Sequence, residues 1–137
     1  MKSLLILSFL VLGGIGSCHS TKESVKLEDV KWVLETLNGE AVKLSEEGSA
    51  MFVKFNAAEG RVNGCAVCNR FFGDFELDGA GLKFSHMGAT RMACRDMEKE
   101  DEFFRMMDKV DGYAIKDNIL SFLSKDKVVA TFRKSAD

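Results

Sequence analysis

The chain has no proline, one tryptophan, one tyrosine and two histidines among its 137 residues. Without proline, tight turns depend on Gly, Asn and Asp, which tolerate the required backbone conformations. The sequence also lacks a G-x-S-x-G motif, an H-E-x-x-H motif and a phosphate-binding glycine loop. We therefore expect a protein that is not an enzyme, with no catalytic residues, no cofactor and no metal.

Neither a strong charge excess nor a long apolar run is present. Lys and Arg number 19 against 21 Asp and Glu, which gives a formal net charge of −2 and no basic patch typical of nucleic-acid binding. The main apolar run covers residues 4–16, and a helix of that length rises only about 20 Å. A bilayer core of ~30 Å excludes it as a membrane span.

The N-terminus has the order of a secretory signal: Lys2, the apolar run, then small residues. Ile15-Gly16-Ser17-Cys18 resembles the bacterial lipobox, which implies that the Cys18 sulfur is acylated and that residues 1–17 are removed. An ordinary signal with a chance cysteine is the alternative. We expect an exported protein, anchored by lipid in the bacterial cell envelope and in the outer membrane in preference to the inner. Its first partner is then the membrane itself.

Two segments follow the signal. Residues 18–30 are polar and charged and predict a flexible tether, with Val25 and Leu27 as the only argument for an early strand. Residues 31–137 are long enough for one hydrophobic core, so one domain is expected.

Short β-compatible runs separated by Gly, Asn and Asp dominate this domain. Asn38-Gly39 predicts a tight hairpin turn, and Asp117-Asn118 predicts a second turn near the C-terminus. The expected strands cover residues 32–37, 40–44, 50–55, 61–66, 71–77, 82–87, 112–116, 118–123 and 127–134.

One segment has helical spacing instead. Phe103, Met106, Met107 and Val110 recur at three and four residues, so residues 97–110 predict a helix with one apolar face. Acidic residues in its first turns suit the helix dipole. Strands, one helix and more strands indicate the α+β class.

Three cysteines remain for the folded domain: Cys65, Cys68 and Cys94. Export makes a disulfide the default use of two of them and leaves one over. Cys65 and Cys68 form a C-x-x-C, which allows a redox protein. Adding Cys94 and His86 allows a zinc site. Arg70, Arg91 and Arg95 allow an anion-binding cluster.

Three motifs together resemble the META domain of HslJ-type heat-shock lipoproteins. They are Trp32-Val33-Leu34, the run GCAVCNRFFG at 64–73 and the run ATRMAC at 89–94, which an acidic helix follows. The resemblance extends over residues 32–133. It implies a disulfide between Cys68 and Cys94, which leaves Cys65 as the free thiol, and it marks Asn69, Arg70, Thr90 and Arg91 as candidate binding or motif residues. Val67 departs from the family, which usually has a small residue there.

The resemblance implies a mainly antiparallel curved sheet or partly open β-barrel with one packed helix. We expect its core to contain nine aromatic residues: Trp32, Phe52, Phe55, Phe71, Phe75, Phe84, Phe103, Phe122 and Phe132. The expected function is that of a non-enzymatic envelope lipoprotein, an interaction or stress-tolerance module. Alternatives are a pilotin-like binder of a lipid tail or peptide, and a thiol-disulfide redox protein. The expected partner is an envelope protein or a small apolar ligand, and not nucleic acid.

Overall fold

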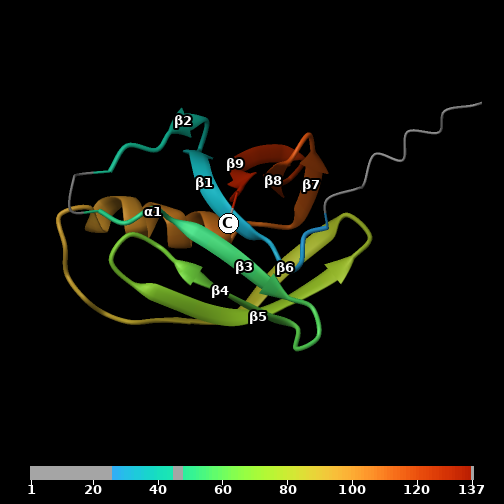
Figure 1. Cartoon of the computed structure of the whole chain (residues 1–137), viewed down its shortest axis with the longest axis horizontal. Coiled ribbons are helices and arrows are strands. Elements are labelled where there is room, and N and C mark those ends of the chain that lie inside the picture. Colours follow the sequence, from blue (N-terminus) through green and yellow to red (C-terminus); the bar gives the residue numbers. More distant parts are fainter. Residues whose placement is uncertain (1–25, 45–47, 137) are drawn as a thin grey trace, which may run out of the picture.

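A computed structural model describes residues 26–44 and 48–136 of the chain, as nine strands and one helix (Figure 1). The helix, α1, follows six strands and precedes three. The elements are β1 (Lys31–Leu37), β2 (Glu40–Ala41), β3 (Phe52–Asn56), β4 (Arg61–Cys65), β5 (Arg70–Asp78), β6 (Gly81–Ala89), α1 (Met97–Met107), β7 (Gly112–Lys116), β8 (Ile119–Ser124) and β9 (Lys127–Lys134). The α+β class is thereby confirmed.

The two predicted turns are present. Asn38 and Gly39 have φ values of 50° and 85°, and Asp117 and Asn118 have values of 51° and 63°. These left-handed conformations close the β1–β2 and β7–β8 hairpins. The second arm of the first hairpin, β2, is only two residues long, instead of the five that the sequence predicts.

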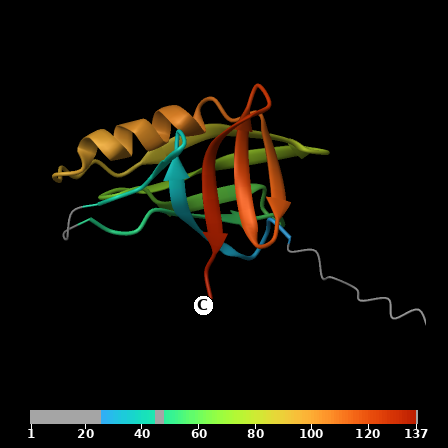
Figure 2. The same cartoon turned by 90° about the horizontal axis from the view of Figure 1, so that it is seen from above.

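The sheet closes on itself into a partly open barrel. Each strand is antiparallel to its neighbour in the order β2-β1-β3-β4-β5-β6-β7-β8-β9, and β1 also pairs with β9 (Figure 2). Between β6 and β7 the ladder contains a single pair, Gly81 with Gly112. The predicted curved, mainly antiparallel sheet is confirmed, and its incomplete side lies at the β6–β7 junction.

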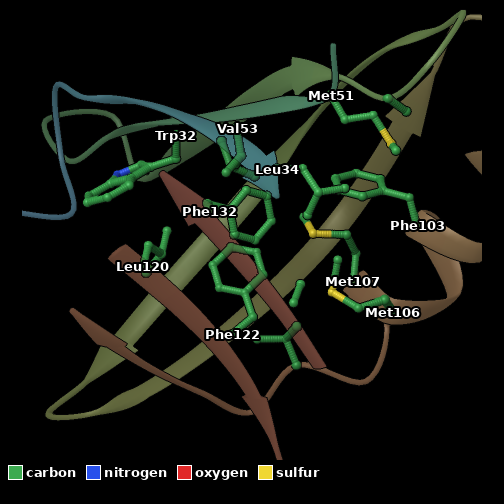
Figure 3. Close-up of a cluster of buried hydrophobic side chains, with 14 of the residues drawn as sticks. Trp32, Leu34, Met51, Val53, Phe103, Met106, Met107, Leu120, Phe122 and Phe132 are labelled. Carbon is green, nitrogen blue, oxygen red and sulfur yellow. The ribbon is translucent and has the colours of Figure 1, made fainter. Parts of the chain in front are cut away.

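Helix α1 lies in the chain between β6 and β7 and covers one end of the barrel. Phe103, Met106 and Met107 point from it toward Leu34 and Phe132 (Figure 3). The helix ends at Met107, three residues earlier than predicted, but Val110 is still buried after the end.

Aromatic rings fill the barrel interior. Centroid distances are 4.6 Å for Phe122 and Phe132, 5.5 Å for Phe84 and Phe122, and 5.0 Å for Phe55 and Phe75. Seven of the nine predicted core aromatics are buried, and Phe84 is half-buried against them.

The prediction for Phe52 is wrong. Because successive side chains of a strand alternate and Val53 and Phe55 point inward, Phe52 lies on the outer face. There the Lys31 ammonium lies 5.0 Å from its ring centroid.

The predicted tether is shorter than expected at its C-terminal end. Leu27 is buried in the core, and the Trp32 indole N–H donates a hydrogen bond of 2.8 Å to the Leu27 carbonyl. The Asp29 backbone N–H donates to the Phe55 carbonyl at 3.2 Å. Residues 27–30 therefore pack on the barrel, without forming a strand. The predicted signal peptide, Cys18 and residues 19–25 of the predicted tether lie outside the described residues. Among the described residues, no helix is long and apolar enough to cross a membrane.

Candidate functional site

Asn69 is the centre of a buried polar network where the chain enters β5. Its side-chain oxygen accepts hydrogen bonds from the Thr90 hydroxyl at 2.9 Å and the Met92 backbone N–H at 2.7 Å. Its amide group donates to the Met92 carbonyl at 3.0 Å and to the Glu100 carboxylate. One side chain thus joins the β4–β5 turn to the segment after β6 and to α1.

Glu100 completes the network from the first turn of α1. It is only 3% exposed, and one of its carboxylate oxygens accepts backbone N–H groups from Val67, Cys68 and Asn69 at 3.1, 2.9 and 3.0 Å. Three consecutive N–H groups of this kind form an anion-binding concavity. In this protein the occupant of that concavity is the protein's own carboxylate.

Residues 90–95, which we call the strap, cross the surface between β6 and α1. The Thr90 hydroxyl accepts a hydrogen bond from the Arg70 backbone N–H at 3.1 Å. The Asn69 side chain forms hydrogen bonds with both the backbone N–H and the carbonyl of Met92. A disulfide joins Cys94 to Cys68, whose Cα atoms are 6.2 Å apart, as the family resemblance implies. The strap is exposed along its whole length yet fixed at three points, and Met92 is 61% exposed.

The strap separates two surface clefts, and Thr90, Met92 and Ala93 line both. The cleft on the helix side, of about 560 Å³, also contains Arg91. The cleft on the β4–β5 side, of about 490 Å³, also contains Arg70. These two arginines therefore line different clefts.

Cys65 is the free thiol, half-buried in the same cleft as the disulfide. Burial raises the pKa of this thiol, the Arg70 guanidinium opposes the rise and the Glu100 carboxylate adds to it. A thiol with a raised pKa is a poor nucleophile at neutral pH, because the thiolate is the reactive form. The two cysteines of the C-x-x-C do not form a disulfide with each other, because Cys68 pairs with Cys94.

His86 lies away from the cysteines, on the outer face of the sheet. Its Nδ1 is 2.9 Å from the Asp74 carboxylate, which also pairs with Arg61 at 3.0 Å. Within residues 26–44 and 48–136, no group of three or more His, Cys, Asp or Glu side chains is arranged to hold a metal ion.

Glu100 is the site residue that the sequence did not single out. In the sequence it is one of several acidic residues near the helix N-terminus, where negative charge is favourable. Its spacing was the missed signal, since it lies three residues before Phe103 and seven before Met107, which places it on the buried helical face.

Comparison with known proteins supports the fold and the family. An NMR structure of a protein from Burkholderia xenovorans is 22% identical, with a TM-score of 0.64, over 87% of this chain and 98% of that one. A second NMR structure is 23% identical, with a TM-score of 0.62, over 78% of this chain and 90% of that one. No curated protein matches. The META domain model matches residues 25–137, and the chain belongs to this family.

Proposed function

We propose that this protein is an exported, lipid-anchored interaction module of the bacterial cell envelope, with no enzymatic activity, whose partner surface is the strap. The observation that carries this proposal is that the polar side chains of the buried network use their hydrogen-bonding groups inside the protein. The side chains of Asn69, Thr90 and Glu100 bond to one another and to the backbone, so they position a surface instead of offering reactive groups.

The chemistry of the strap suits protein recognition. Its exposed residues include Arg91 and Met92, and arginine and methionine are both enriched at protein interfaces. A strap fixed by a disulfide and by Asn69 loses little conformational freedom on binding, which favours affinity. We expect the partner to be another envelope protein.

Two alternatives have less support. A lipid tail inside the barrel, as in a pilotin-like binder, competes with the contacts among Phe55, Phe84 and Phe122. Thiol-disulfide exchange requires a reactive Cys65, whose pKa is raised by burial. Activity in an insulin-reduction assay would nevertheless favour the redox alternative.

Site-directed photocrosslinking in cells tests the partner surface. A photoreactive amino acid at Met92 is expected to trap one discrete envelope protein. The same group at Val128 of β9, which is 53% exposed and also apolar, is the control and is expected to trap none. Equal crosslinking at both positions would contradict the strap as the partner surface.

Metabolic labelling with palmitate tests the anchor. Label is expected on the wild-type protein and not on the Cys18→Ala variant. An unlabelled wild-type protein would remove the lipid anchor from the proposal, whatever the crosslinks show.

A further inference from the structure

The outer face of β1, β3, β4, β5 and β6 carries an ordered set of side chains, of which only Cys65 and Arg70 also line the cleft on the β4–β5 side of the strap. Strand pairing places these side chains in three parallel rows. The middle row consists of Lys31, Lys54, Asn63, Phe72 and Gly88. A row on one side consists of Val33, Phe52, Cys65 and Arg70. The row on the other side consists of Asn56, Arg61, Asp74 and Ser85. We call these three rows the basic face.

Cations outnumber carboxylates on this face. The three rows contain four Lys or Arg side chains and one carboxylate, a formal balance of +3, whereas the whole chain is −2. Asp74, the one carboxylate, already pairs with Arg61. Lys54 and Arg70 are exposed, and neither occurs in an ion pair between described residues. Three acidic side chains lie at the border of the rows: Glu76 and Asp78 toward the β5–β6 turn, and Asp29 in a cleft that Lys54 also lines.

Two aromatic rings accompany these cations. Phe72 is 50% exposed and lies against Gly88, where a Cβ atom would come within 2.8 Å of its ring. Phe52 is half-buried under the Lys31 ammonium. Cations together with exposed aromatic rings are the combination that binds the interface of an anionic bilayer.

The start of the folded chain lies beside the basic face. Asp29, Val30 and Lys31 line one cleft together with Lys54 and Asn63. Cys18 precedes Lys26, the first described residue, by eight positions, and a chain of that length spans at most about 28 Å even when fully extended. An acyl chain on Cys18 therefore keeps this side of the barrel close to the membrane surface.

We propose that the basic face docks onto the anionic phospholipid headgroups of the membrane in which Cys18 is anchored. This inference rests on the lipid anchor of the proposed function. It assigns the acyl chain and the basic face as two joint membrane contacts, and a second contact of this kind fixes the orientation of the barrel on the bilayer.

Vesicle flotation of lipid-free protein tests the docking directly. The protein starts at residue 18 and carries Cys18→Ser, which removes acylation and retains all the described elements. We expect binding to vesicles of phosphatidylglycerol and phosphatidylcholine that weakens as salt is added, with no binding to pure phosphatidylcholine. Lys54→Ala with Arg70→Ala should weaken binding about 25-fold, since each cation near an anionic surface contributes about fivefold.

Two control variants accompany the measurement. Lys54→Arg with Arg70→Lys keeps both charges and is expected to keep the affinity. Lys109→Ala with Lys127→Ala removes two exposed charges outside the basic face and is expected to change binding little. Equal losses in the two alanine variants, equal binding to neutral vesicles, or no vesicle binding would overturn the proposal.

A control with a second polyanion tests whether the basic face binds any polyanion and not membranes in particular. Equal affinity for single-stranded DNA would show unspecific polyanion binding and would also overturn the membrane assignment. Flotation needs neither acylation nor a protein partner, whereas palmitate labelling and crosslinking at Met92 are measured with Lys54 and Arg70 unchanged. Failure of this inference is thus distinguishable from failure of the proposed function.

Discussion

The side-chain amide of Asn69 donates a hydrogen bond to the buried carboxylate of Glu100, which lies 31 residues further along the chain. This contact joins the β4–β5 turn to α1, and the same asparagine fixes the strap through Met92. Both residues therefore support the fold and the presentation of the strap at the same time. Their polar atoms are fully used, since the described part of the chain contains no buried side-chain nitrogen or oxygen without a hydrogen-bond partner.

Glu100→Gln should destabilise the protein by about 3 kcal/mol, because hydrogen bonds to a buried charge are strong and costly to lose. A glutamine directs an NH₂ group either at the three backbone N–H donors or at the Asn69 amide, so each orientation places two donors against one another. Urea unfolding measures the loss.

The matched control for this change is Glu98→Gln on the exposed side of the same helix. It should change the free energy of unfolding by no more than about 0.5 kcal/mol. Equal effects of the two substitutions would show that helix charge, and not the buried network, accounts for the loss.

The strands and the two turns were predictable because their signals are local. Asn38-Gly39 and Asp117-Asn118 specify left-handed turns, and strand alternation shows within a few residues. Barrel closure required pairing of β1 with β9, where the hydroxyls of Thr36 and Thr131 meet at 2.6 Å across 95 residues. No local pattern encodes such a pair, and here the family resemblance supplied the prediction.

The candidate site was only partly predictable for the same reason. Asn69 and Thr90 stood out through the family motifs, but their partner Glu100 depended on which helical face is buried. The outward position of Phe52 was missed although the sequence carries a signal for it, since Lys54 lies two residues later on the same face of the strand and is exposed.

Loss of the disulfide should cost about 3.5 kcal/mol, because the bridge closes a loop between positions 26 residues apart and so reduces the entropy of the unfolded chain. The Cys68→Ser, Cys94→Ser double variant is compared with Cys65→Ser by urea unfolding without reductant. The Cys65→Ser variant, which keeps the bridge, should lose much less. In the lipid-free Cys18→Ser protein, unfolding without reductant should expose one free thiol, and a count of three would contradict the bridge.

Asn38→Gly tests a contact between the first hairpin and α1. The pKa of Glu102 is lowered first by its hydrogen bond from Lys99 and then by the Asn38 amide, which donates at 2.8 Å. Glycine keeps the left-handed turn and removes only the second bond, so the pKa of Glu102 should rise toward its ordinary value in an NMR titration of the side-chain carboxyl carbon.

The accompanying stability change has a definite pH dependence. A lowered folded-state pKa contributes stability above the unfolded pKa of about 4.3, and this contribution is lost as the pH falls through the folded value. The stability deficit of the variant relative to wild type should therefore be larger at pH 7 than in strong acid. Asn118→Gly, the same substitution in another left-handed turn, should leave the pKa of Glu102 unchanged.

The reactivity of Cys65 decides between a structural thiol and the redox alternative. Because burial raises its pKa, less of the thiol is ionised at pH 7 in the folded protein than in the unfolded chain. Alkylation by iodoacetamide at pH 7 should be slower in the folded protein than in the unfolded chain. The pH at which the rate reaches half its plateau should be higher in the folded protein.

Arg70→Ala should move this midpoint higher still, because the guanidinium favours the thiolate, while Lys54→Ala should not. Restricted access alone would lower the plateau and leave the midpoint in place. A midpoint below that of the unfolded chain would instead reveal an activated thiol and would favour exchange chemistry over a purely structural cysteine.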